Sequence, residues 1–373
     1  MKLFDVYPIN YIEPAKALGS TIWDKDGVEY LDLYGGHAVI SIGHSHPYYV
    51  RKMTKQIKNL GFYSNSVKIS LQDELADKLG KLSGLKDFSL FLANSGAEAN
   101  ENALKLASFH TGRTKIVAFT KAFHGRTSAA VAVTDNPAIK APINFDHHVE
   151  FIPFNDVEAV KRAVDDQTCA VIVEGIQGVG GIQVATDEFM KAIRIACDKT
   201  GAVFIHDSVQ CGYGRSGKFF TFQHSKVKPD IVSVAKGMGN GFPVGAILIS
   251  PKFEAKHGLL GTTFGGNHLA CVAGISVLDV IKKEKLVENA ATLGAYLFEE
   301  LGKFSNIKDL RGKGLMIGIE LEEPVKDIRN KMLFEDKMFT GVAGSHTIRL
   351  LPSLALKKEE ADRFLEVFRK YVK

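Results

Sequence analysis

An acidic residue and a lysine each follow an apolar run near the middle of the chain. Residues 201–207 begin with a glycine typical of a helix end and continue as a buried strand that closes on Asp207. Residues 230–236 form a second apolar run, which closes on Lys236. Because open α/β folds bind ligands at the carboxyl ends of their strands, we expect the two side chains to meet at one edge of a sheet. A lysine can form a Schiff base with a carbonyl cofactor, and an aspartate can keep a pyridine nitrogen protonated, so the pair predicts pyridoxal phosphate chemistry.

A segment of small residues, Asn94-Ser-Gly-Ala-Glu-Ala-Asn100, lies between a predicted strand and a predicted helix. Small residues let backbone N–H groups approach an anion, and a helix N-terminus favours negative charge. Ser95 adds a hydroxyl group, so the segment is a candidate phosphate site. Taken alone, Ser95 would be an N-cap, and the nearby acid and lysine favour the phosphate interpretation.

A third candidate segment, Ala122-Phe-His-Gly-Arg126, follows the predicted strand at residues 115–119. The ring of Phe123 could stack on a planar cofactor. Arg126 could hold a carboxylate through two parallel hydrogen bonds. Taken singly, a core aromatic residue and a surface ion pair are the simpler interpretations of these two side chains.

Two other patterns invite a different chemistry and fit it badly. The glycine-rich loop at residues 237–243 suggests a dinucleotide site, but it lacks the GxGxxG spacing and no acid stands at a strand end about twenty residues later. The pairs His44/His46 and His147/His148 have no helical spacing and no third ligand nearby, so we expect no metal site.

These side chains must be positioned by a regular framework, and the order of the predicted elements indicates an α/β fold. Strands are expected at residues 89–92, 115–119, 170–174, 203–207, 231–235 and 246–250, and helices at 71–82, 97–111, 187–200 and 269–282. This alternation is typical of a mostly parallel sheet covered by helices. Helices at 286–304 and 359–371 flank short strands at 315–321 and 347–351, which indicates a smaller α+β domain. We expect residues 1–45 to be an N-terminal arm that joins the small domain, 46–268 the large domain, and 269–373 the rest of the small domain.

Composition restricts the class of protein. The 373 residues are 45% hydrophobic and 24% charged, with a net charge of +5, as in an ordinary globular protein. Lysines and arginines stand among acids, so no nucleic-acid partner is expected. No apolar run resembles a signal peptide or a membrane span, and the four cysteines have no CxxC spacing. We therefore expect a cytoplasmic protein with reduced thiols and no membrane partner.

Together these motifs resemble the class III aminotransferases of PLP fold type I, and among them the acetylornithine and succinylornithine aminotransferases of arginine biosynthesis. The resemblance covers nearly the whole chain. It is carried by six motifs in order: residues 94–100, Phe123-His-Gly-Arg-Thr127, Glu174-Gly-Ile-Gln-Gly178, Asp207-Ser-Val-Gln210, Lys236-Gly and Thr262-Thr-Phe-Gly-Gly-Asn267. Each motif is weak alone, and all six in this order are specific.

The resemblance implies roles around the cofactor ring. Lys236 would form the Schiff base with pyridoxal 5'-phosphate and then carry the proton between the substrate and the cofactor. Asp207 would pair with the pyridinium nitrogen. Val209 and Phe123 would pack on the two ring faces, and Gln210 would bond to the phenolic oxygen.

The resemblance also implies roles in binding the phosphate and the substrates. The phosphate would be held by Ser95, Gly96 and Ala97. Thr263 would reach the phosphate of a neighbouring subunit, which implies a homodimer with shared active sites. Arg126 would bind the carboxylate of the N-acyl-ornithine, and Arg349 the α-carboxylate of glutamate or 2-oxoglutarate. His37 occupies a position where relatives vary with substrate.

Two positions depart from the family pattern. Ser208 stands where relatives usually carry Glu, and we expect it to face away from the ring. Val179 stands where relatives that transaminate a terminal amine usually carry a Glu that masks the second arginine. Valine cannot accept a hydrogen bond from Arg349, so either another acid does so or the arginine stays open.

Several functions therefore remain open on the sequence. The preferred one is transfer of the distal amine of N2-acyl-ornithine, with an acetyl or succinyl group, to 2-oxoglutarate, which yields the semialdehyde and glutamate. Another ω-amine donor, ornithine or 4-aminobutyrate, is the alternative that Val179 suggests. A nicotinamide-dependent oxidoreductase and a catalytically silent binding protein are weaker alternatives.

Overall fold

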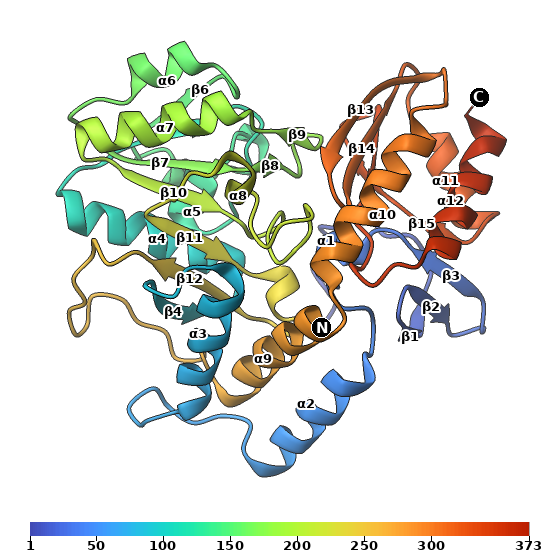
Figure 1. Ribbon diagram of the computed structural model, residues 1–373, viewed down its shortest axis with the longest axis horizontal. Coiled ribbons are helices and arrows are strands. Elements are labelled where there is room, and N and C mark those ends of the chain that lie inside the picture. Colours follow the sequence, from blue (N-terminus) through green and yellow to red (C-terminus); the bar gives the residue numbers. More distant parts are fainter. Residues whose placement is uncertain (373) are drawn as a thin grey trace.

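A seven-stranded sheet forms the centre of the larger part of the molecule in the computed structural model, which describes residues 1–372 (Figure 1). In spatial order the strands are β4 (Ser89–Ala93), β12 (Gly245–Ile249), β11 (Ile231–Val234), β10 (Val203–Asp207), β7 (Thr168–Glu174), β5 (Lys115–Phe119) and β6 (Val149–Ile152). Only β12 runs antiparallel to its neighbours within this sheet. The predicted α/β class with a mostly parallel sheet is therefore confirmed.

Helices cover both faces of this sheet because successive residues of each strand point to opposite sides. On one face, Ile205 and Ile231 pack with Ala103 of α4 (Gly96–Thr111) in one apolar cluster. On the other face, Phe204 and Val232 belong to a second cluster that contains residues of α7 (Asp187–Thr200). The remaining helices of this part are α2 (Pro47–Asn59), α3 (Ser70–Ser83), α5 (Ser128–Ala132), α6 (Val157–Ala163), α8 (Phe222–Ser225) and α9 (His268–Lys283).

The predicted elements of this part agree with the observed ones to within two residues. Strands β5 and β10 and helix α7 have the predicted bounds. Helix α7 is sharply limited because the Thr186 side chain accepts a hydrogen bond from the Phe189 N–H, and Gly201 ends the helix in the left-handed conformation, with φ of 74°.

A second sheet forms the smaller part of the molecule, at the right of Figure 1. Its order is β13 (Ile307–Lys313), β14 (Met316–Leu321), β17 (Thr347–Leu350) and β16 (Gly341–Ala343), all antiparallel. The helices of this part are α10 (Leu286–Leu301), α11 (Lys326–Phe334) and α12 (Lys358–Tyr371). The predicted helix at 286–304 ends three residues early, at Leu301, and residues beyond it lead into β13.

The N-terminal segment lies beside this second sheet. Strands β1 (Pro14–Leu18), β2 (Thr21–Asp24) and β3 (Glu29–Asp32) form an antiparallel ribbon, and β3 pairs in parallel with β15 (Met338–Phe339). Helix α9, which the expected division at residue 268 assigns to the small domain, packs on α2 and α3. The division of the chain into 1–45, 46–268 and 269–373 stays a prediction.

The remaining elements of the chain are short. They are α1 (Gly35–Ala38), η1 (Pro137–Ile139), η2 (Pro142–Asn144), the hairpin of β8 (Ile176–Gln177) and β9 (Gln183–Val184), and η3 (Lys236–Met238). Within residues 1–372, no helix combines the length and the apolar character needed to cross a membrane.

Candidate active site

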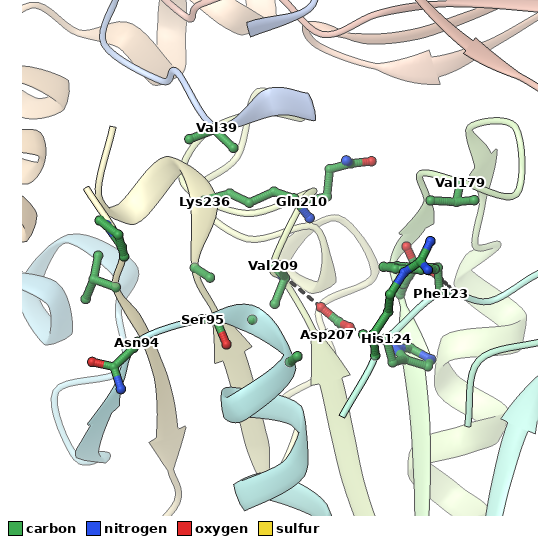
Figure 2. Close-up of a pocket in the computed structure, with 18 of the residues that line it drawn as sticks. Val39, Asn94, Ser95, Phe123, His124, Val179, Asp207, Val209, Gln210 and Lys236 are labelled. Atoms are coloured by element: carbon green, nitrogen blue, oxygen red, sulfur yellow. Dashed lines mark hydrogen bonds and ion pairs between the residues drawn. The ribbon is translucent and has the colours of Figure 1, made fainter. Parts of the chain in front are cut away.

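A cavity of about 430 Å³ opens where the carboxyl ends of β10 and β11 meet the start of α4 (Figure 2). Nine of the twelve predicted site residues line it: Ser95, Gly96, Ala97, Phe123, Arg126, Asp207, Val209, Gln210 and Lys236. The other three, His37, Thr263 and Arg349, are not among its lining residues. The sheet edge therefore brings together side chains that are up to 141 positions apart, from Ser95 to Lys236.

Asp207 is the last residue of β10, and its buried carboxylate is fixed on both oxygens. Oδ2 accepts hydrogen bonds from Nδ1 of His124 and Nδ2 of Asn100, each at 2.7 Å, and Oδ1 accepts one from the Val209 N–H at 2.9 Å. Burial alone would raise the pKa of Asp207, but the hydrogen bonds and the charge of His124 outweigh it and hold the pKa below its ordinary value. The carboxylate is thus kept ionised, with room on Oδ1 for a further donor in the cavity.

Lys236 begins η3 directly beyond β11, the parallel neighbour of β10. Its backbone φ is 43°, a conformation that a residue with a side chain adopts at a cost and that clusters at functional sites. Figure 2 shows the side chain extending from η3 toward Gln210. Burial lowers the pKa of the Lys236 amine, although Asp207 and Glu174 oppose this shift. A lysine of this kind has a larger neutral, nucleophilic fraction than an exposed one.

The N-terminus of α4 faces the same cavity. Ser95 is the N-cap, and its hydroxyl accepts a hydrogen bond from the Glu98 N–H at 3.2 Å. Gly96 allows a close approach, because a Cβ atom there would lie 2.6 Å from Cγ1 of Val209. The simple N-cap and the anion site are therefore compatible: the cap fixes the first turn while its free N–H groups and positive dipole end face the cavity.

Three further predicted residues surround the space between Asp207 and Lys236. Phe123 and Val209 both line the cavity, and the Phe123 N–H donates to Oε1 of Glu174 at 3.0 Å. Gln210 donates through Nε2 to the His37 carbonyl at 3.2 Å, while its Oε1 is buried without a partner among the described residues. A buried unpaired acceptor is costly, and this oxygen packs on Gly178, where an added Cβ would overlap it.

Two arginines differ sharply in their surroundings. Arg126 is exposed at the cavity and, within residues 1–372, makes no hydrogen bond or ion pair, so the surface ion pair is not present. Arg349 is only 5% exposed and does not reach the cavity lining. Its Nη1 donates to the Gly178 carbonyl at 2.9 Å and its Nη2 to the Tyr34 hydroxyl at 3.2 Å. Within residues 1–372, no acid forms an ion pair with Arg349.

The remaining positions of interest lie around the site. Ser208 is buried and its hydroxyl bonds to Nδ1 of His206 at 2.8 Å, outside the cavity lining. Thr263 is exposed and lies outside the cavity of its own chain. His44 bonds to Asp32 at 2.8 Å and His46 to Glu284 at 3.0 Å.

Three functional neighbours escaped the sequence analysis. His124 and Asn100 hold the Asp207 carboxylate, and both stand inside motifs that were recognised without a role for them. Glu174, at the end of β7, accepts hydrogen bonds from the N–H groups of Phe123 and Gly178, and burial raises its pKa to about 7. The sequence signal available for them was their predicted position: His124 in a loop, Asn100 near the start of a helix and Glu174 at the end of a strand.

Comparison with known proteins adds to this geometry. A family model described as aminotransferase class-III matches residues 6–372. An acetylornithine aminotransferase of Caldanaerobacter subterraneus is 40% identical over 98% of this chain and 95% of its own length, and one of Nitrosomonas europaea is 38% identical over 97% and 94%. The ornithine aminotransferase of Toxoplasma gondii, solved with partial occupancy of PLP at its active site, superimposes with a TM-score of 0.90 at 28% identity, over 97% of this chain and 90% of the other.

Proposed function

The chain belongs to the class-III aminotransferases, and on this premise we propose that it transfers the distal amine of an N2-acyl-ornithine to 2-oxoglutarate. The products are the N-acyl-glutamate semialdehyde and glutamate, as arginine biosynthesis requires. The observation that carries the chemistry is the buried amine of Lys236, with its lowered pKa, in the same cavity as the ionised Asp207.

The cofactor is pyridoxal 5'-phosphate, which when bound supplies an electron sink for breaking the C–H bond beside the amine. The residues present fit it. Oδ1 of Asp207 accepts one hydrogen bond, from the Val209 N–H, which leaves a lone pair that could pair with a pyridinium nitrogen, and the buried Gln210 Oε1 lacks a partner within the described chain. Gly96 keeps the start of α4 close to Val209, where a Cβ atom would collide.

Each side chain of the cavity then has a proposed task. Asp207 would keep the ring nitrogen protonated, and His124 and Asn100 hold Asp207 in place. Lys236 would hold the cofactor through its amine and would move the proton at the amine-bearing carbon of the substrate. Phe123 and Val209 would contact the two faces of the cofactor ring, and Gln210 its phenolic oxygen. The phosphate would be held by Ser95, Gly96 and Ala97.

The two arginines provide separate carboxylate sites, which suits a reaction with two different substrates. The exposed, unpaired Arg126 is suited to the α-carboxylate of the acyl-ornithine. The buried Arg349 is suited to the α-carboxylate of glutamate or 2-oxoglutarate. His37 stands between Gln210 and Tyr34 and belongs to this second site.

We also propose a homodimer with shared active sites. Large apolar side chains of the N-terminal arm are exposed, among them Leu3 at 98%, Phe4 at 90% and Tyr11 at 94%, and such a surface favours coverage by another chain. Thr263 lies outside its own chain's cavity beside the exposed Phe264, where it could reach the phosphate in a second copy. All four cysteines are buried and unpaired, which favours a cytoplasmic location.

Single-turnover discharge of the coloured holoenzyme tests the substrate. We expect N-acetylornithine or N-succinylornithine to discharge the cofactor colour, and 2-oxoglutarate to restore it. Ornithine and 4-aminobutyrate form the comparison panel, because Val179 at the cavity is the observation that favours another ω-amine. A strong preference for an unacylated amine would contradict the proposal.

A further inference from the structure

Arg349 is a buried cation. The guanidinium is an obligate cation with five N–H donors, yet within the described residues it forms no ion pair. Only the Gly178 carbonyl and the Tyr34 hydroxyl accept from it, and its Nε is buried without a partner. Val179, the next residue after Gly178, offers no acceptor in its side chain. A buried guanidinium left in this state favours any carboxylate that can reach it.

The position of Tyr34 beside Arg349 is fixed by backbone hydrogen bonds and by packing. Oδ1 of Asp32 accepts hydrogen bonds from the N–H groups of Tyr34 at 2.9 Å and Gly35 at 2.8 Å. The tyrosine ring packs on Gly341, where an added Cβ would overlap the ring atom Cε2. Gly341 pairs directly with Arg349 across β16 and β17. The pairing of β16 with β17 and the absence of a side chain at Gly341 therefore place the Tyr34 hydroxyl at the Arg349 guanidinium.

The polarity of the hydrogen bonds follows from the donors available. Arginine can only donate, so the Tyr34 oxygen accepts from Nη2. The hydroxyl proton then points to Nδ1 of His37, 2.5 Å away, which must be unprotonated. Burial lowers the pKa of His37, and the charges of Arg349 and Lys236 lower it further, so the neutral imidazole is favoured. The oxygen of Tyr34 thus presents lone pairs to Arg349, as a carboxylate would.

His37 is held there by an unusual backbone. Gly35, Gly36, His37 and Ala38 all have positive φ, of 55°, 54°, 66° and 65°. This left-handed turn costs energy at His37 and Ala38, which have a Cβ atom. The turn is tied to the cavity because the His37 carbonyl accepts from Nε2 of Gln210. Strain that places one imidazole against one tyrosine indicates a specific task for the pair.

We propose that Tyr34 and His37 form a neutral cover over Arg349 that determines substrate selection in place of an acid. Tyr34 accepts a hydrogen bond from Nη2 of Arg349 while the acyl-ornithine carboxylate binds Arg126, and this cover yields when a dicarboxylate brings its own carboxylate to Arg349. This inference rests on the proposed function, since it needs two substrates that alternate in one cavity. A substrate carboxylate that displaces the neutral Tyr34 hydroxyl does not have to separate an ion pair. The cover can therefore act in a chain that has valine, and no acid, at position 179.

The test is calorimetric binding of glutarate, an unreactive dicarboxylate, to the holoenzyme. If the hydroxyl competes with the ligand, Tyr34→Phe should bind glutarate about tenfold more tightly, the order expected for one hydrogen bond to a charged group. His37→Asn should also bind it more tightly, because the tyrosine proton is then free to turn to the carboxylate. Asparagine tolerates the left-handed conformation, so this variant keeps the turn.

Tyr48→Phe is the matched control, because it removes a hydroxyl that bonds to Asp279 between α2 and α9. We expect no change in its glutarate affinity. Unchanged or weaker glutarate binding by Tyr34→Phe, with normal cofactor absorbance, would overturn the cover and make Tyr34 a support for the carboxylate. Failure of the proposed function would appear differently, as a wild-type enzyme that acyl-ornithine cannot discharge.

The two half-reactions give a second readout. With the cover removed, the acyl-ornithine carboxylate can bind unproductively at Arg349, so kcat/KM for acyl-ornithine should fall while kcat/KM for glutamate is kept or rises. Installing the acid by Val179→Glu in the Tyr34→Phe background should restore the original ratio. A parallel loss in both half-reactions, without rescue by the glutamate, would contradict a role in selection.

Discussion

Nδ1 of His124 lies 2.7 Å from Oδ2 of Asp207 in the core of the site, where both side chains are buried. The same carboxylate oxygen accepts from Asn100, and Oδ1 accepts from the Val209 N–H. This arrangement fixes the direction of the carboxylate as well as its charge. The bond also joins two of the sequence motifs, since His124 comes from the loop after β5 and Asp207 from the end of β10.

Removal of the Asp207 charge should stop the chemistry while leaving the fold. In Asp207→Asn the amide cannot keep a ring nitrogen protonated, so kcat should fall by about a hundredfold or more. His124→Asn should lose less, since Asn100 and the Val209 N–H still hold the carboxylate. Single-turnover rates with saturating acyl-ornithine measure both. Equal losses in the two variants would contradict the positioning role of His124.

A methyl group at Gly96 should weaken cofactor binding. The new Cβ would lie 2.6 Å from Cγ1 of Val209, so Val209 or the start of α4 must shift. We expect the cofactor Kd of Gly96→Ala to rise at least tenfold, measured by titration of the cofactor-free protein. Gly61→Ala is the control, because its Cβ would meet only the Leu269 side chain, at an ordinary 3.5 Å from Cδ1 and 3.9 Å from Cγ. Similar affinities in the two variants would exclude a tight cradle at α4.

Loss of the exposed arginine should act mainly on acyl-ornithine. A bidentate charge-assisted contact is worth roughly 1.5–3 kcal/mol, so Arg126→Ala should lower kcat/KM for acyl-ornithine by about tenfold to hundredfold. The half-reaction with an amine that lacks the carboxylate should be nearly unaffected. An equal loss with both donors would show that Arg126 does not bind the carboxylate.

Glu174 predicts a pH dependence of stability in the cofactor-free protein. Burial raises its pKa in the folded state to about 7 from an ordinary 4.5. The folded state therefore holds this proton more tightly than the unfolded chain, so the stabilisation is complete below pH 4.5 and is lost as the pH rises through 7. Glu174→Gln should show a smaller fall in Tm between pH 5 and 8 than wild type. An identical fall in the variant would assign the dependence to other groups.

Much of the large part of the fold could be predicted from the sequence because several local signals agree for each element. The strand-end positions of Asp207 and Lys236 follow from apolar runs that end in a charged residue, and α7 follows from its cap residues Thr186 and Gly201. The strands β15 and β16 escaped because elements of two and three residues are too short to show an alternating pattern.

The parts of the site that depend on distant pairings could not be read in the same way. His124 and Asp207 are 83 positions apart, and Tyr34 and Arg349 are 315 apart. The left-handed turn at His37 opposes the preference of a residue with a side chain, so its sequence gives no signal for it. The valine at 179 was visible as a missing acid, but the hydroxyl that accepts from Arg349 appears only once the strands are paired.

The central claim is that the amine of Lys236 carries the cofactor, and borohydride reduction of the holoenzyme tests it most directly. Reduction converts the C=N bond to a stable amine, so peptide mapping should find the pyridoxyl group on Lys236 of the wild-type protein and on no residue of Lys236→Ala. The variant should also lack the visible absorbance of a cofactor bonded covalently to the protein, and it should not catalyse the reaction. A pyridoxyl label on another lysine, or a Lys236→Ala protein that keeps both colour and turnover, would contradict the account.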